Sequence, residues 1–404
     1  MKIKLPTSHF PTLLMAFLIP FPVRITGFAI FIITVAYFFY LLANKKFDFA
    51  IFRKPLVALF IVSFAMIVLG LFWGNFKNGG MNVERGLFIL CFPVVFFHAA
   101  KYSSLTVSQV AISFFSGCLV VSLVGWGHAI WSTDYASLSS GHTQFTGFLD
   151  IHPTYLSVFF IFSFFFFKES LQKKYFQILP KQQAGYALAA LYCFVMVFFL
   201  RSQIAMLSFV ILLSVYFIIR LKKRAWLVTF ILFTIVFLTY LLDTHRVSTY
   251  FDRYGKNVST ALDNRSKLWG GVLQAIKTSP VFGAGTGAEQ ERINEGYKTV
   301  GYTEGIANSY NAHNQYLQFW VRNGLPELIC FLVLLFVLFA QALKMRSLTF
   351  LIFLMMVSMV MLTESFLSVQ KGIVFFYFFA CVFTLLPEEQ AVRETDQRSL
   401  HKTQ

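Results

Sequence analysis

The chain has 404 residues, of which 57% are hydrophobic, 19% aromatic and only 13% charged, and its mean hydropathy is +0.67. A soluble domain carries about a quarter charged residues, so this composition excludes an ordinary soluble protein and favours one built within a membrane. The formal net charge of +16 invites a nucleic-acid-binding interpretation, but the distribution of the charge along the chain argues against it.

About twelve apolar stretches follow one another, most of them long enough to cross the roughly 30 Å hydrocarbon core. The first lacks a small-residue cleavage site, so we interpret it as a retained helix rather than a signal peptide. The sequence therefore predicts an all-α polytopic membrane protein, with 1–404 as a single membrane domain. The expected spans lie near 10–22, 24–43, 55–73, 86–100, 107–131, 151–167, 185–200, 202–220, 225–242, 316–341, 348–365 and 370–387.

The basic residues follow the topology. With the N-terminus inside, the cytoplasmic segments hold most of the 34 lysines and arginines, including clusters at 45–46, 173–174 and 222–224. This positive-inside pattern places both termini in the cytoplasm, including a polar tail at 388–404 that we expect to be disordered. Because topology explains the charge, we expect the membrane lipid as a partner and no nucleic acid.

One long polar segment, from about 243 to 315, forms a large loop on the outer, periplasmic side. Loops much beyond 15 residues are usually functional or disordered. Within this loop a helix can begin near Arg265 and end at Pro280, with Leu268, Val272, Ala275 and Ile276 on one face. This amphipathic helix is expected to lie flat on the membrane; packing on its own loop is the alternative.

His313 is the first candidate for chemistry. It lies where the long loop meets an apolar span, and a histidine there is suited to general-base work near neutral pH. A helix-capping histidine is the structural alternative. Arg85, Arg201 and Arg265 are predicted on the same outer face, where the planar guanidinium matches phosphate oxygens. Each arginine on its own is more typical of the membrane interface than of a ligand site, but three on one face favour an anion site.

Other polar residues give weaker signals. His152 opens a span and could reach the same cavity, or could mark a simple helix entry before a proline. Glu364, near the outer end of its span, is a functional candidate or a structural tie to Arg201. The five cysteines lie in spans without a CxxC pair, and no histidine spacing indicates a metal site. The glycine-rich run at 283–287 lacks the ending of a phosphate loop, so we expect a tight turn and no nucleotide cofactor.

The order of these features resembles the O-antigen ligase and polymerase superfamily. Arg201 stands in an outer turn, Arg265 opens the loop helix, and His313 follows the glycine turn, so the core of the resemblance covers about 195–330. In the ligase signature, histidine is followed by Asn, Ser or Gln, nine residues, glycine, two residues, and Gly, Thr or Tyr. Asn314 and Gly324 match this signature, whereas Glu327 departs from it.

The resemblance implies metal-independent, inverting glycosyl transfer, without a cofactor, at the periplasmic face of a bacterial cytoplasmic (inner) membrane. The donor would be a glycan on undecaprenyl diphosphate and the acceptor a sugar hydroxyl. His313 would take the acceptor's proton, while Arg201 and Arg265, assisted by Arg85, would bind the diphosphate. Asn314, His152 and Glu364 would be supporting residues.

Three functions compete at this stage. A ligase would use lipid A-core as acceptor, whereas a polymerase of O-antigen, capsule or exopolysaccharide would use another lipid-linked repeat unit. The third candidate is a transporter of lipid-linked sugars. A transporter should show internal repeats and charges near mid-membrane, and we detect neither in the sequence.

Overall fold

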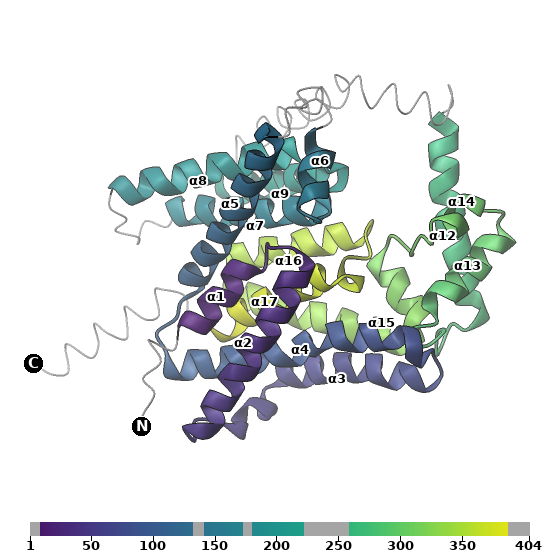
Figure 1. Ribbon diagram of the computed structural model, residues 1–404, viewed down its shortest axis with the longest axis horizontal. Helices are drawn as coiled ribbons and strands as arrows, with labels where there is room; N and C mark the ends of the chain where they lie inside the picture. The colour runs from purple at the N-terminus through teal and green to yellow at the C-terminus, as the bar shows by residue number, and fades with distance from the viewer. Residues whose placement is uncertain (1–8, 132–140, 173–179, 222–257, 387–404) are drawn as a thin grey trace, which may run out of the picture.

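The computed structural model describes residues 9–131, 141–172, 180–221 and 258–386, and every regular element in these ranges is a helix (Figure 1). The α-helices are α1 (Phe10–Leu18), α2 (Val23–Ala43), α3 (Pro55–Leu69), α4 (Phe76–Tyr102), α5 (Val107–Trp131), α6 (Gly141–Phe148), α7 (Pro153–Gln172), α8 (Pro180–Phe199), α9 (Gln203–Leu221), α12 (Val258–Thr278), α13 (Glu289–Thr299), α14 (Thr303–Ala307), α15 (Gln315–Lys344), α16 (Leu348–Met361) and α17 (Gln370–Leu385). Short 3₁₀ turns occur at η1 (Phe49–Arg53), η2 (Gly70–Phe72) and η5 (Phe366–Ser368).

The expected spans are confirmed in part. Within the described ranges, eight helices are long and apolar enough to cross a membrane: α2, α3 extended by η2, α4, α5, α7, α8, α9 and α15. The spans expected at 348–365 and 370–387 are the shorter helices α16 and α17, and the first expected span contains only the nine-residue α1. The span expected at 225–242 and the tail at 388–404 lie outside the described residues.

Helix α17 forms the centre of the bundle. Its residues from Lys371 to Phe383 are all buried, and it packs on α4, α2 and α5 (Figure 1). Phenylalanines supply much of this core. The Phe379 ring packs edge to face on that of Phe114, with centroids 5.0 Å apart, and lies tilted against that of Phe162, with centroids 4.3 Å apart. Because lipid tails are as apolar as these side chains, close packing rather than water exclusion holds the helices together.

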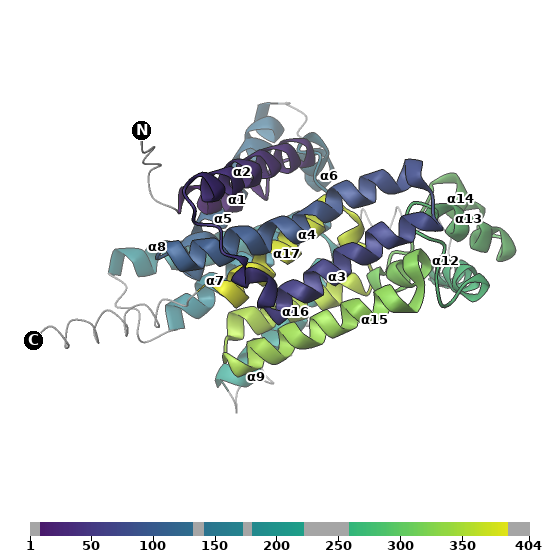
Figure 2. The ribbon, with the colours of Figure 1, turned by 90° about the horizontal axis from the view of Figure 1, so that it is seen from below.

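Helix α15 is broken near its start. Asn323 and Gly324 leave the helical conformation, with φ of 72° at Gly324. The break separates a short helix at 315–322 from a long one at 325–344, which spans about 30 Å at 1.5 Å per residue. The long part lies beside α3, which separates it from α4, while α12, α13 and α14 gather at one end of the bundle (Figure 2).

The glycine turn at 283–287 docks into this break. The Ala284 and Gly285 amides donate to the carbonyls of Val321 and Arg322 at 2.8 and 2.7 Å. Thr286 continues the contact, since its amide donates to the Gly70 carbonyl at 2.9 Å and its hydroxyl to the Ile67 carbonyl at 2.8 Å. The turn expected from the sequence therefore fastens the outer loop to both α15 and the end of α3.

The apolar face of α12 has a different partner from the one expected. Leu268, Val272, Ala275 and Ile276 are buried in a separate core, because α12 packs on α13 and α15. This face is therefore not free to lie on a membrane, and the alternative of packing within the loop is correct. Large exposed apolar side chains occur instead at the docked turn, where Phe282 is 64% exposed beside Trp73.

Gly283 tests the docking of the turn. Its φ is 69°, and a Cβ there would collide with the Arg322 carbonyl and the Gly324 amide. We expect Gly283→Val to cost at least about 1–3 kcal/mol and to lower the thermal unfolding temperature in detergent. Gly80→Ala is the matched control, since a Cβ at Gly80 meets nothing within 4 Å. An unchanged unfolding temperature in Gly283→Val would show that the turn does not need its left-handed backbone.

Candidate active site

The polar segment that ends the long loop joins the connection between α16 and α17. We call this connection, residues 362–369, the α16–α17 loop. The Ser365 hydroxyl donates to Asn311 Oδ1 at 3.1 Å, and the Leu367 amide donates to Gln315 Oε1 at 2.6 Å. Gln315 is fully buried. Two segments about fifty residues apart in the chain are thus held together by hydrogen bonds.

His313 and Glu364 meet where these segments join. His313 Nδ1 lies 3.6 Å from Glu364 Oε2, and the two side chains are 34% and 26% exposed. The His313 backbone has φ of 41° and is fixed by its amide, which donates to Asn311 Oδ1 at 2.9 Å. The Tyr310 ring stands edge-on to the imidazole at 5.7 Å. The imidazole of His313 is therefore accessible to solvent, and its Nδ1 side faces the carboxylate of Glu364.

Asn314 holds His313 at the start of α15. Its Oδ1 accepts from the amides of Tyr316 and Leu317 at 3.0 and 3.1 Å, which caps the free N–H groups of the helix. Its Nδ2 donates to the Leu362 carbonyl at 3.0 Å. One side chain therefore caps α15 and ties it to the end of α16.

From the length of α16 we infer that the α16–α17 loop lies below the surface of the membrane. Lys344 and Arg346, just before α16, suit one boundary of the bilayer. The 14 residues of α16 rise only about 21 Å from there, short of the roughly 30 Å core. Irregular backbone is tolerated at that depth only within protein or beside a cavity. The His313–Glu364 pair is therefore recessed into the bundle.

Helix α7 brings His152 to the same region. The Tyr155 hydroxyl donates to the Phe366 carbonyl at 3.3 Å, and the Tyr155 ring stacks on that of Phe366 at 4.8 Å. His152 stands 6.2 Å from the Tyr155 ring. The polar start of α7 therefore borders the α16–α17 loop, although among the described residues no hydrogen bond or ion pair joins His152 to His313.

The three arginines differ in their placement. Arg85 is joined to the α16–α17 loop directly, since its Nη1 donates to the Ser368 carbonyl at 3.0 Å. Arg201, with φ of 50°, lies in the turn before α9, and the next residue, Ser202, shares a 2.9 Å hydrogen bond with Thr154 at the start of α7. Arg265 is exposed on α12, and no hydrogen bond or ion pair in the described structure links it to His313.

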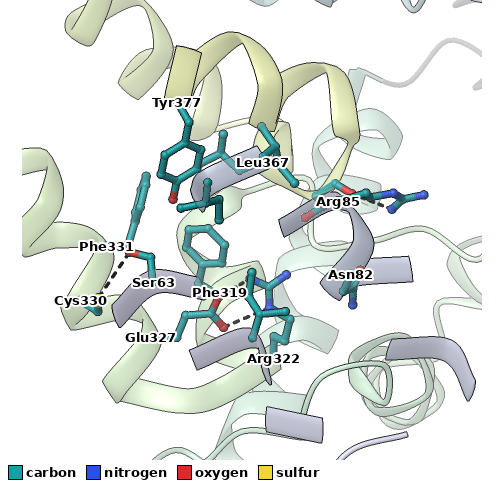
Figure 3. A pocket seen from close by; sticks show the side chains of 14 residues that line it. Ser63, Asn82, Arg85, Phe319, Arg322, Glu327, Cys330, Phe331, Leu367 and Tyr377 are labelled. Carbon is teal, nitrogen blue, oxygen red and sulfur yellow. Dashed lines mark hydrogen bonds and ion pairs between the residues drawn. The ribbon is translucent and has the colours of Figure 1, made fainter. Parts of the chain in front are cut away.

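A pocket opens on the other side of the α16–α17 loop, between α3, α4, α15 and α17 (Figure 3). Arg322 and Glu327 form an ion pair in it, with Arg322 Nε 3.1 Å from Glu327 Oε2. Both residues are only 5% exposed. The local sequence pattern does not predict this pair. The single signal for it was Glu327 itself, the residue that departs from the ligase signature.

No group of three or more histidine, cysteine, aspartate or glutamate residues in the described ranges is arranged to hold a metal ion.

Residues 188–332 match a family model described as O-antigen ligase. The match covers about a third of the chain and supports the resemblance of this segment to the O-antigen ligase superfamily. The matched segment runs from α8 into α15 and includes Arg201, Arg265 and His313.

A second comparison finds an uncharacterised protein of Haemophilus influenzae, 30% identical to this chain over 89 residues. The aligned segment is 22% of each protein, so the match spans about a fifth of that relative's length and carries no activity with it. Members of the O-antigen ligase family are glycosyltransferase-like enzymes that act on lipid-linked glycans and sugar acceptors in general.

Glu327 tests the buried pair. Glu327→Gln leaves the Arg322 charge buried without its partner, so we expect a loss of about 3–5 kcal/mol, read as a lower unfolding temperature. Replacing both residues with methionine removes both charges and should destabilise less than Glu327→Gln alone. The exposed Glu291→Gln is the matched control. Equal unfolding temperatures for Glu327→Gln and the control would contradict the structural role of the pair.

Proposed function

We propose that this protein is a membrane glycosyltransferase that moves a glycan from undecaprenyl diphosphate to an acceptor sugar hydroxyl. The observation that supports this most is the accessible His313 imidazole, backed by Glu364 at 3.6 Å and recessed at one end of the bundle. The resemblance to the O-antigen ligase superfamily supplies the class of chemistry. The proposed type is a ligase with lipid A-core as acceptor.

In the proposed reaction His313 is the general base. In the tautomer with its proton on Nδ1, 3.6 Å from Glu364 Oε2, the Nε2 lone pair takes the proton of the acceptor hydroxyl. The acceptor oxygen then bonds to the anomeric carbon as the bond from that carbon to the diphosphate oxygen breaks. A single displacement of this kind inverts the anomeric centre. The electron pair leaves on the diphosphate, a good leaving group that needs no general acid.

Arg201 and Arg265 are proposed to bind the diphosphate and to stabilise the charge that grows on it. Both lie within the segment that matches the family model. Asn314 would keep His313 at the start of α15 through its cap and its bond to Leu362. His152 would border the site from the start of α7.

The recessed site suits a donor whose diphosphate is held near the membrane by its lipid. We propose that the protein resides in a bacterial cytoplasmic membrane with both termini in the cytoplasm and the site on the periplasmic face. Lys344 ends α15 and Arg346 lies just before α16, at the ends of these helices opposite to His313 and Glu364. This placement agrees with the positive-inside pattern.

A polymerase of the same chemistry is the second candidate. Glu327 occupies the position where the ligase signature has Gly, Thr or Tyr, and here it is bound to Arg322 inside the bundle. A polymerase would transfer the growing glycan to another lipid-linked repeat unit in place of lipid A-core.

A reconstituted assay distinguishes the two functions. Undecaprenyl-diphosphate glycan is supplied with or without lipid A-core, in the absence of added nucleotide or metal. A ligase attaches glycan to the core, whereas a polymerase forms longer lipid-linked chains and leaves the core unmodified. If a native donor yields neither product, the proposed transferase function is wrong.

The roles of His313 and Glu364 can be separated in this assay. His313→Ala should reduce transfer by about 10²- to 10⁴-fold, the usual contribution of a general base. Glu364→Gln should lower kcat by about tenfold or more with little change in KM, because the carboxylate orients the base and does not bind substrate. His128→Ala, a histidine that stacks on Phe148, should retain activity. Full activity of His313→Ala would remove the general base from the mechanism.

A further inference from the structure

The pocket between α3, α4, α15 and α17 is separate from the His313–Glu364 pair. Neither of these two residues lines it. Its lining combines the apolar side chains of Ile89, Phe319 and Phe331 with the polar residues Arg85 and Ser368, and Figure 3 shows Arg85 set apart from Phe319 and Phe331. A space with both apolar and polar lining suits an amphiphile better than a small polar solute.

Arg85 is a cation without a carboxylate partner. Its guanidinium donates to the Ser368 carbonyl, and no carboxylate in the described part of the chain lies within 4 Å of it. Arg322, the other cation of the pocket, is neutralised by Glu327. Glu289, close to the mouth, is bound by Asn82 Nδ2 at 2.8 Å and by the Gly287 amide. The positive charge left over in the pocket is therefore that of Arg85.

The depth of Arg85 matches that of a lipid phosphate. Lys101, at the other end of α4, pairs with Asp48 outside the spans and marks one membrane boundary. Arg85 is about 24 Å from it along the helix at 1.5 Å per residue, about one turn short of the roughly 30 Å core. A flexible arginine side chain covers that remaining distance towards the headgroup layer.

Ser368 adds a hydroxyl without a partner. Its Oγ is shielded from solvent and makes no hydrogen bond within the described residues. Unpaired buried hydroxyls are uncommon. Because nothing holds this one, rotation about χ1 towards the pocket breaks no hydrogen bond.

We propose that this pocket binds the phosphate group of a lipid, with the phosphate on Arg85 and Ser368 and the chain along the apolar side chains. The ligand class is a phosphate-bearing lipid, either a membrane phospholipid or a polyprenyl phosphate. This proposal assigns Arg85, which the resemblance gave an assisting role at the diphosphate, to a separate lipid site whose occupancy does not depend on the transferase function. Ser368 belongs to the α16–α17 loop and Arg85 donates a hydrogen bond to it. The bound lipid therefore stabilises the loop that carries Glu364.

The test is thermal unfolding of the purified full-length protein in detergent. The protein is titrated separately with phosphatidylglycerol, undecaprenyl phosphate, inorganic phosphate and diacylglycerol. We expect at least one phosphate-bearing lipid to raise the unfolding temperature, and the comparison of the first two probes identifies which lipid is preferred. Diacylglycerol and inorganic phosphate should give little or no shift, because each supplies only half of the interaction.

Two variants locate the binding. Arg85→Gln should weaken it by about tenfold or more, as expected for a lost charge-assisted hydrogen bond, whereas Arg24→Gln, an exposed arginine on α2, should not. Ser368→Ala should leave the unfolding temperature of the lipid-free protein unchanged, because its hydroxyl has no partner to lose, and still weaken lipid binding several-fold.

Equal lipid-induced shifts in wild type, Arg85→Gln and Ser368→Ala would overturn the proposed site. An equal shift from diacylglycerol and phosphatidylglycerol would contradict recognition of the phosphate group. A full shift from inorganic phosphate alone would contradict a role for the lipid chain. None of these measurements involves glycan transfer, so they succeed or fail independently of the proposed enzymatic function.

Discussion

The structure depends on how the backbone N–H and C=O groups of the α16–α17 loop find hydrogen-bond partners inside the bundle. Non-helical backbone at membrane depth must find hydrogen-bond partners within the protein, because lipid offers none. The carbonyls of Leu362, Phe366 and Ser368 accept from Asn314, Tyr155 and Arg85, and Gln315 accepts from the Leu367 amide. The side chains that complete this backbone come from α4, α7 and the start of α15. The same requirement therefore draws the polar residues of the candidate site to one place and fixes Glu364 beside His313.

The second constraint is the break in α15. The long part of that helix has the length of a span, and the short part turns to place His313 and Asn314 against the end of α16. The break is possible because Gly324 adopts a positive φ and because the glycine turn at 283–287 pairs with the freed backbone. The outer loop and His313 are thus linked through the backbone. The turn that anchors the segment from α12 to α14 also stabilises the bend that orients the first turns of α15.

The sequence predicted the class of fold because long apolar stretches have few alternatives in a membrane. It also predicted His313 at a loop–helix boundary and the glycine run as a turn. It did not predict that α16 and α17 have only 14 and 16 residues. For α16, Glu364 and Ser365 interrupt the apolar run only slightly. The pattern of α12 showed an apolar face but not its partner, and α13 and α15 proved to cover Leu268 and Val272. The pairing of His313 with Glu364, and of Arg322 with Glu327 across the α15 break, depends on tertiary geometry that no local pattern encodes.

The central claim is that His313 and Glu364 act as one unit held by the α16–α17 loop. A double-mutant cycle on the single-turnover rate of glycan transfer tests it most directly, with His313→Gln, Glu364→Gln and the double variant compared with wild type. If Glu364 acts through His313, the double variant will be no slower than His313→Gln alone. If the two losses instead multiply, the residues act independently and the proposed role of Glu364 is contradicted.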